Sequence, residues 1–184
     1  EIKKPDVKGS PVLTLKQGTS ILKSDFDSNA ERQVKEVKAS AWDFSTQSIT
    51  EAVSSEPDAV DQGDDDGATL ADSVGGGTIE LHSTVPLDPD YLKTWADARL
   101  LKARLAKITG SISFYGSSLV TPGKTIEIQG MGSKYNGNAY VSGVHHRISE
   151  GTWITECEVG LSEKWFSETK PNISGGAGGG LLPG

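Results

Sequence analysis

The residues best able to do chemistry gather between positions 145 and 158 of the chain. His145 and His146 are adjacent, and Cys157, the only cysteine, lies between Glu156 and Glu158. A cysteine in contact with a histidine can act as a nucleophile with its base. A group of histidine, cysteine and carboxylate side chains can bind a metal ion. Either chemistry requires these side chains to share one face of the local structure.

Strand alternation predicts that they do not share a face. "YVSGVHHRI" and "TWITECEVGL" have the pattern of two strands, and "SEG" at 149–151 predicts the turn between them. Successive side chains of a strand point to opposite faces, so His145 and His146 cannot both ligate one metal ion. One face of the first strand is expected to carry Tyr140, Val144, His146 and Ile148, and the other His145 and Arg147. One face of the second strand is expected to carry Trp153, Thr155, Cys157, Val159 and Leu161.

The apolar neighbours of Cys157 predict a buried thiol with a raised pKa, which is a poor nucleophile. His146 is expected to be a structural histidine that hydrogen-bonds the backbone at the edge of the core, and His145 to be solvated. A catalytic pair of Cys157 and His146 stays open as an alternative if the two lie across the sheet from each other. The chain has no GxSxG, Walker A, HExxH or dinucleotide motif, so we expect no catalytic residue, cofactor or metal ion.

The segment 54–77 is rich in carboxylates and glycines and has no aromatic residue. Its low apolar content predicts a solvated, flexible loop. The alternative is a calcium loop, in which Asp64, Asp66 and Gly67 take the third, fifth and sixth positions of an EF-hand. That register places Gln62 and Ser73 at the first and twelfth positions, where Asp and Glu are typical, and it therefore favours the solvated loop.

The composition disfavours two classes of partner. The 184 residues include 25 acidic and 18 basic side chains, for a net charge of −7, and no run of Lys and Arg exceeds two residues. Neither nucleic acid nor an anionic membrane is therefore expected. No apolar run approaches the roughly 20 residues of a membrane span. The N-terminus lacks the apolar segment of a signal peptide, which predicts synthesis in the cytoplasm, and the absence of an initiator Met predicts that the chain is cut from a longer protein.

The clearest element is a helix that begins at Asp88. Asp88 is a good N-cap, Pro89 suits the first turn, and basic residues gather towards Lys107 at the other end. An apolar stripe at three- and four-residue spacing predicts the face that packs on a sheet or on a neighbouring subunit. This stripe consists of Tyr91, Trp95, Ala98, Leu101, Leu105 and Ile108.

After Gly110 the apolar period changes from that of a helix to that of a strand. "SISFYG" and "TIEIQG" predict two strands joined by a turn at "TPGK", and Asn136 with Gly137 predicts a two-residue hairpin turn. We therefore expect a small antiparallel meander or barrel over residues 109–161.

The N-terminal part is less clear. "SPVLTLKQGTSIL" predicts a short strand that ends before Gly18. Residues 28–43 permit a helix with a capping box of Ser28 and Glu31, or a strand that ends near Trp42. The fold class expected from all segments is mainly β with one long helix (α+β): a small antiparallel β-barrel preceded by a mixed segment.

Two stretches carry a family resemblance. "LVTPGKTIEIQG" and "YNGNAYVSGVHHRISEGTWITECEVGLSEKWF" contain a Pro-Gly turn, a Gly turn, a Tyr-Val strand with Val-x-His, and a Gly-x-Trp-x-Thr strand ending in Gly-Leu. This order resembles the VgrG-like, or phage late control D, hub and spike proteins. The matching positions are Pro122, Gly123, Ile126, Gly130, Gly137, Tyr140, Val144, His146, Gly151, Trp153, Thr155, Gly160 and Leu161.

The resemblance is good over 88–166, fair over 12–44 and absent over 54–77. "SILKSDFDSNAERQVKEVKASAWD" is similar to a strand of the family, which favours strand over helix for 34–43. The resemblance divides the chain into a strand-containing hub segment (1–53), an acidic flexible loop (54–78), a helix plus antiparallel β-barrel hub domain (79–168) and a Gly-rich linker (169–184). The Leu-Pro-Gly near the end implies that an OB-fold-like spike domain follows.

The resemblance implies a structural, non-catalytic role in a contractile injection machine: a contractile phage tail, a type VI secretion system or an extracellular contractile injection system. It implies a homotrimer in the full-length protein, which joins the inner tube and baseplate to a trimeric spike in a particle that is ejected or released. The alternative is a ligand- or receptor-binding β module, carbohydrate-binding or adhesive, that uses Tyr115, Tyr135 or Trp165 as a stacking surface.

Overall fold

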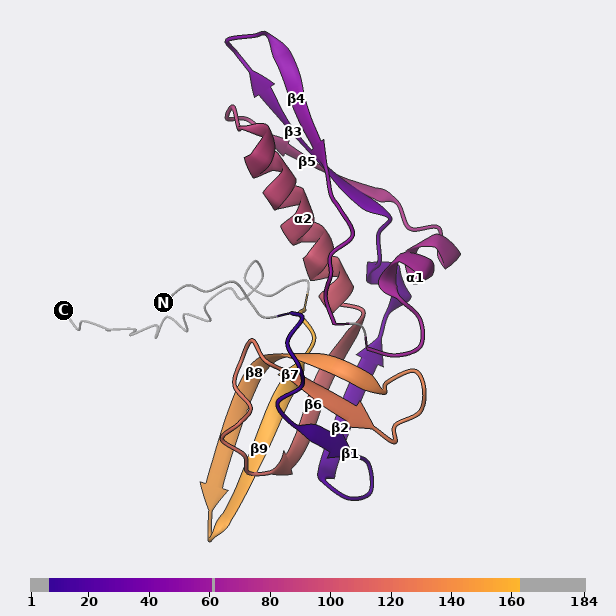
Figure 1. The fold of residues 1–184 in the computed structure, drawn as a ribbon, viewed down its shortest axis with the longest axis vertical. Helices are drawn as coiled ribbons and strands as arrows, with labels where there is room; N and C mark the ends of the chain where they lie inside the picture. Colours follow the sequence, from indigo (N-terminus) through magenta and orange to yellow (C-terminus); the bar gives the residue numbers. More distant parts are fainter. Residues whose placement is uncertain (1–6, 61, 163–184) are drawn as a thin grey trace, which may run out of the picture.

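The computed structural model describes residues 7–60 and 62–162, which form two sheets and two α-helices (Figure 1). The strands are β1 (Thr14–Lys16), β2 (Ile21–Ser28), β3 (Glu36–Asp43), β4 (Ser48–Val53), β5 (Thr78–Ser83), β6 (Ile108–Tyr115), β7 (Thr125–Gln129), β8 (Gly137–Ser149) and β9 (Thr152–Val159). The helices are η1 (Ala30–Arg32, a 3-10 turn), α1 (Gly67–Ser73) and α2 (Pro89–Leu105). The expected class, mainly β with one long helix, is confirmed.

Six strands form a curled half-barrel in the order β1-β7-β8-β9-β6-β2. All neighbours are antiparallel except β1 and β7. The alternation in β6 and β7 places the predicted apolar side chains inside. The buried core consists of Leu15, Ile112, Phe114, Val120, Ile126, Ile128, Ala139, Val141, Cys157 and Val159.

The other three strands form a sheet in the order β4-β3-β5, and α2 covers one face of it (Figure 1). We call this sheet with α2 the helix module. Its core consists of Val37, Ala39, Ala41, Leu92, Ala96 and Leu100. Alanines on both sides let the helix approach the sheet closely.

The face of α2 that packs on the sheet is not the predicted stripe, although Leu105 and Ile108 at the end of that stripe are buried. Leu92, Ala96 and Leu100 face the sheet, whereas Tyr91 and Trp95 of the predicted stripe are 71% and 39% exposed. The helix has two apolar stripes at helical spacing, and the one with the smaller side chains fits against the alanines of β3. The N-cap is as predicted, because the Asp88 carboxylate accepts a hydrogen bond from the Asp90 N–H at 2.9 Å.

Residues 28–43 contain both a helical turn and a strand. The strand prediction is confirmed by β3. The capping box at Ser28 is wrong, because Asn29 caps η1 through a side-chain oxygen that accepts from the Glu31 N–H.

The acidic segment is not a solvated loop throughout. Residues 67–73 form α1, and Gly67, Ala71 and Gln62 are buried. Asp66 caps this helix through its carboxylate, which accepts from the Thr69 N–H at 2.7 Å. The flexible-loop prediction missed this helix because Asp66, its N-cap, follows two other aspartates. A run of aspartates is as typical of a loop as of a helix cap.

Of the two predicted hairpin turns, one is wrong and the other is confirmed. β7 and β8 are joined by residues 130–136, so the two-residue turn predicted at Asn136 and Gly137 is wrong. Instead, the Asn136 Oδ1 accepts a hydrogen bond from the Met131 N–H within this longer connection. The two-residue turn lies between β8 and β9, where Glu150 and Gly151 both have positive φ, as a type I′ turn requires. The turn predicted at "SEG" is thereby confirmed.

Candidate functional site

The β8–β9 hairpin holds most of the side chains that the sequence singled out. Across the hairpin, Val144 pairs with Cys157, His146 with Thr155, and Ile148 with Trp153. The register shifts between Val141 and Gly143, which marks a β-bulge. Because a bulge reverses the alternation, Val141 faces the same core as Val144, and Tyr140 turns to the other side.

The predicted common face of Tyr140 and Val144 is therefore wrong. Tyr140 packs instead with Val7 and Leu105, where the half-barrel meets the end of α2. Leu161 also packs in the cluster of Tyr140, Val7 and Leu105, and not on the same face as Cys157 as predicted. The sequence signal for the bulge is Gly143, because glycine inside a strand pattern often marks one.

Cys157 is fully buried in the half-barrel core, which confirms the predicted inert environment. Burial, and then the nearby charge of Glu156, raise the pKa of its thiol to about 12. The cross-strand neighbour of Cys157 is Val144, and that of His146 is Thr155. The alternative of a catalytic pair is wrong, because the two residues are not opposite each other.

The ring of His146 hydrogen-bonds two side chains, so the predicted hydrogen bond from this ring to the backbone is wrong. Its Nδ1 lies 2.9 Å from the Thr155 Oγ1 and accepts from the Trp153 Nε1–H at 3.3 Å. The rings of His146 and Trp153 meet edge to face at 5.7 Å. An indole N–H can only donate, so Nδ1 of His146 is the acceptor in this hydrogen bond. His145 is exposed, as predicted.

Trp153 covers a glycine at the end of β6. A Cβ at Gly116 would lie 2.0 Å from the indole ring, and the Gly116 N–H donates to the Trp153 carbonyl at 2.8 Å. The tryptophan is nevertheless 37% exposed. It is therefore a half-buried side chain at the edge of the core.

The other motif positions also lie in the half-barrel. Pro122 and Gly123 form the turn before β7, where the Gly123 N–H donates to the Val141 carbonyl at 2.8 Å. Gly137 and Gly160 have φ of 113° and 75°. At Gly160 a Cβ would also lie 2.1 Å from the Ile108 carbonyl, so only glycine fits. That these residues form a family motif stays a prediction.

The third histidine, which the sequence patterns did not single out, lies between Ser40 and Glu80. His82 Nδ1 lies 2.7 Å from the Ser40 Oγ, and its Nε2 lies 3.5 Å from a Glu80 carboxylate oxygen. Glu80 and His82 are two residues apart on β5, a spacing that could have revealed their common face. The side chains of His82 and Glu80 are 70% and 66% exposed and Ser40 is only partly buried, so the three side chains lie at the surface.

The carboxylates of the proposed calcium loop serve different protein partners. Asp66 caps α1, and a hydrogen bond from the Ser133 side chain is the main cause that lowers the pKa of Asp64. Across residues 7–60 and 62–162, no group of three or more His, Cys, Asp or Glu side chains could hold a metal ion. The calcium alternative therefore has no ligand set in this part of the chain.

A polar junction ties the C-terminal end of α2 to the segments before β3 and after β4. Arg104 is held by both Glu56 oxygens, through Nε at 2.6 Å and Nη2 at 2.8 Å, and its side chain is 8% exposed. Its Nη1 donates to the Val34 carbonyl at 2.9 Å and to the Gln33 Oε1 at 3.3 Å. Gln33, which is 1% exposed, donates to the Ala103 carbonyl at 2.7 Å.

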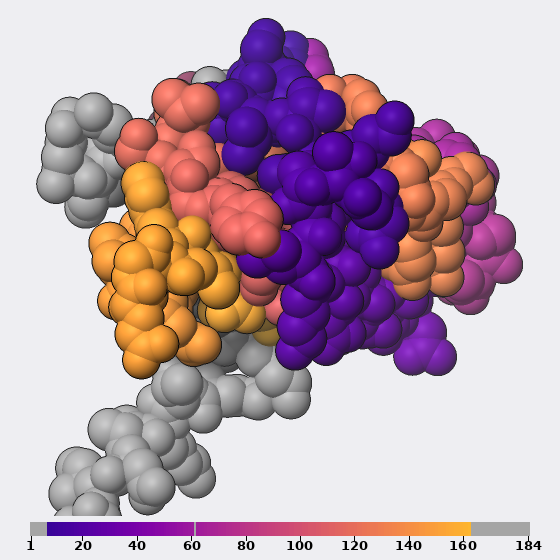
Figure 2. Space-filling view, turned by 90° about the horizontal axis from the view of Figure 1, so that it is seen from below, coloured from indigo at the N-terminus to yellow at the C-terminus, as the bar shows by residue number. Residues whose placement is uncertain are grey.

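Most of the large exposed apolar side chains belong to elements at the two ends of the long axis, and Figure 1 shows where these elements lie. At one end, which we call the α2 end, they are Trp42, Phe44, Ile49, Val85, Tyr91 and Trp95. At the other end, which we call the hairpin end, they are Leu22, Tyr115, Leu119, Ile148 and Trp153. Figure 2 views the hairpin end, where β8 and β9, the segment after β6, and β1 and β2 form one surface.

Two of the three aromatic residues of the ligand-binding alternative lie in the described part of the chain, Tyr115 at the end of β6 and Tyr135 between β7 and β8. Tyr115 is 65% exposed, but Tyr135 stacks on Phe26 with ring centroids 5.8 Å apart. Trp165 lies outside the described residues, as do the predicted linker and the Leu-Pro-Gly. Neither helix of residues 7–60 and 62–162 has the length and apolar content to cross a bilayer.

Comparison with known proteins gives a family and a fold. Residues 1–150 match the family model described as the Alg8 N-terminal domain. No curated protein sequence matches the chain. The structure is similar to the 43 kDa tail protein of prophage MuSo2 from Shewanella oneidensis, at 4% identity and a TM-score of 0.52, over 83% of this chain and 42% of that one.

It is also similar to the tail protein from Neisseria meningitidis MC58, at 15% identity and a TM-score of 0.56, over 87% of this chain and 47% of that one. The chain therefore has a fold found in phage tail proteins, and it spans less than half the length of these two.

Proposed function

We propose that this chain, which belongs to the family of Alg8 N-terminal domains, is a structural part of the hub of a contractile injection machine. In this role it joins an inner tube and a baseplate to a spike. The observation that supports the proposal most is the shared fold of two tail proteins over more than four fifths of the chain.

The local chemistry agrees with a non-catalytic role. The one cysteine is buried opposite Val144, and Ser40, His82 and Glu80 lie at the surface. Large exposed apolar side chains lie at both ends of the molecule, and contiguous apolar surface is typical of protein interfaces.

The partners that we propose follow from the VgrG-like pattern in the half-barrel. They are two further copies of the full-length protein, an inner tube protein, baseplate components, and an OB-fold-like spike domain later in the same chain. The proposed location is a phage tail-like particle or secretion apparatus.

Light scattering on the full-length protein at micromolar concentration tests this assembly. We expect the mass of three chains, and a monomer would contradict the proposed trimer. Co-purification with the tube protein encoded beside its gene tests the hub role. Binding to carbohydrate in a glycan screen without any association with tube or baseplate proteins would favour the ligand-binding alternative instead.

A further inference from the structure

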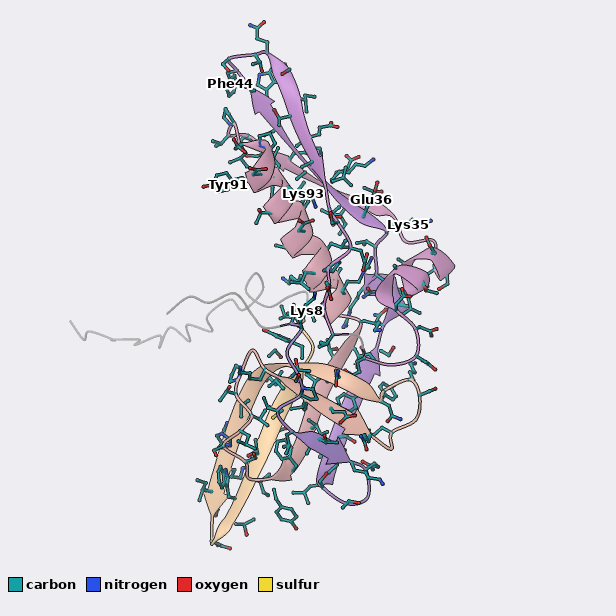
Figure 3. All side chains as sticks on the ribbon, in the orientation of Figure 1. Lys8, Lys35, Glu36, Phe44, Tyr91 and Lys93 are labelled. Carbon is teal, nitrogen blue, oxygen red and sulfur yellow. The ribbon has the colours of Figure 1, made fainter. Side chains whose placement is uncertain are left out.

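His146 is the exposed ionisable side chain on the inner face of the β8–β9 hairpin, the face that continues from the half-barrel core. Val144 and Cys157 lie opposite each other in that core, and His146 follows two residues after Val144 on the same face. The hairpin forms one extreme of the long axis, and Figure 3 shows its side chains with no other element beyond them. Water and protons therefore reach His146 directly.

Two hydrogen bonds meet at the Nδ1 atom of His146. The Trp153 Nε1–H donates to it at 3.3 Å, and the Thr155 hydroxyl oxygen lies 2.9 Å from it. The Ser117 N–H donates to the same Thr155 oxygen at 3.2 Å, which leaves the hydroxyl hydrogen for His146. A protonated imidazole carries a hydrogen on both nitrogens and can only donate. Protonation of His146 therefore removes the acceptor of the Trp153 indole, whereas Thr155 can accept instead of donating.

The geometry of the two rings gives a protonated His146 no compensating attraction to Trp153. A cation is attracted to an indole when it lies over the face of the ring. Here the indole presents its N–H edge to Nδ1, and the two rings meet at 64° with centroids 5.7 Å apart. The edge of an aromatic ring is the positive end of its quadrupole. A charged imidazole therefore repels this edge.

The side chains around His146 do not offset its charge. Those of β8 and β9 that share its face are Val144, Ile148, Trp153, Thr155 and Cys157. Of these only Cys157 titrates, and burial raises the pKa of its thiol to about 12, so it stays neutral near pH 7. The segment after β6 brings Gly116 and Ser117 to this site, both without charge. The ionisable side chains of the opposite face of the hairpin are His145, Arg147, Glu156 and Glu158, and Glu150 lies in the turn.

We propose that protonation of His146 is an acid-sensitive switch that frees the Trp153 indole from the hairpin. With His146 neutral, the indole lies against Gly116, where a Cβ would be 2.0 Å from the ring. With His146 charged, the indole loses its acceptor and turns away from Gly116. The freed ring joins Ile148, which is 74% exposed, and enlarges the apolar surface at the hairpin end. Histidine side chains change charge between about pH 5 and pH 8, so this surface responds in that range. The switch goes beyond the proposed structural role and does not depend on it.

Nuclear magnetic resonance of this chain, recorded from about pH 8 to about pH 5, tests the switch. The indole N–H signal of Trp153 is identified among the four tryptophans by its loss in Trp153→Phe. We expect this signal to move upfield as the pH falls, because its hydrogen bond is lost, in step with the ring signals of His146. The nuclear Overhauser contact between the indole and the Gly116 Hα should disappear over the same range.

Two asparagine variants separate the two adjacent histidines. In His146→Asn the side-chain oxygen takes the place of Nδ1 and accepts from the indole, but it does not ionise. We expect the Trp153 signal of this variant to stay constant with pH and the Gly116 contact to persist. His145→Asn makes the same chemical change on the opposite face of β8 and should keep the response of the parent chain.

The parent chain decides the proposal without either variant. If the ring of His146 titrates and the Trp153 signal stays fixed, the switch is overturned. Persistence of the Gly116 contact at about pH 5 overturns the release of the indole, as does a His146 ring that stays neutral throughout the range. A response that survives in His146→Asn belongs to another group and also overturns the proposal. None of these outcomes bears on the proposed hub role.

Discussion

Trp153 stabilises the end of the β8–β9 hairpin through its cover over Gly116 and its bond to His146. Replacing it with alanine should lower the free energy of unfolding by about 2 kcal/mol, below the roughly 3–5 kcal/mol of a fully buried aromatic side chain. His145→Ala should change it by less than about 0.5 kcal/mol, because the side chain is exposed. Urea denaturation measures both. A larger loss for His145→Ala would mean that the faces of β8 are reversed.

Cys157 should react with a thiol reagent only when the protein unfolds. Burial raises the pKa of its thiol from about 9 to about 12, so between these pH values the folded state holds a proton that the unfolded state has lost. Stability from this group is therefore present below pH 9 and falls as the pH rises towards 12. Denaturation at several alkaline pH values should show a shallower fall for Cys157→Ala than for the parent chain. Equal slopes would argue against the raised pKa.

Residue chemistry was predictable wherever strand alternation was unbroken. The separation of His145 from His146 and the burial of Cys157 required only a period of two and apolar neighbours. Tyr140 was assigned to the wrong face because the bulge at Gly143 adds a residue that no periodic rule counts. Ser40 and His82 are distant in sequence, and only the pairing of β3 with β5 brings them together.

Among the elements, α2 depends on the polar junction at its C-terminal end. Arg104→Met keeps the aliphatic packing but leaves the Val34 carbonyl and the Gln33 amide oxygen without their donor. Since Gln33 is buried, we expect a loss of about 2–3 kcal/mol in the free energy of unfolding. Glu56→Gln should cost less than about 1 kcal/mol, because Glu56 is half exposed and the amide still accepts a hydrogen bond. Thermal or urea unfolding compares the two, and similar losses would show that the ion pair dominates.

Some element ends could be predicted from local signals, whereas the capping box at Ser28 and the turn at Asn136 could not. The cap at Asp88 and the Pro-Gly turn at Pro122 are local signals, and the structure confirms both. The face of α2 was not local, because Leu92 and Tyr91 both begin apolar stripes. The choice between them is made by the small side chains of β3, which lies far away in sequence.

The whole molecule is built from two interleaved modules. The chain leaves the half-barrel after β2, builds β3 and β4, and returns at Gln62, whose backbone pairs with Gly137 of β8. It then builds α1, β5 and α2 before it enters the half-barrel again at β6. The domain limits predicted from the sequence stay a prediction.

Interleaving predicts that the two modules unfold together. Leu100→Ala removes apolar volume from the core of the helix module and should cost about 3 kcal/mol. Because Leu105 and Tyr140 pack together where the modules meet, amide hydrogen exchange should quicken in β6 to β9 as much as in α2. Ile148→Ala, at an exposed position, should quicken neither region. Faster exchange confined to α2 and its sheet would show instead that the helix module opens alone. The contact of Leu105 with Tyr140 would then couple the stability of the two modules only weakly.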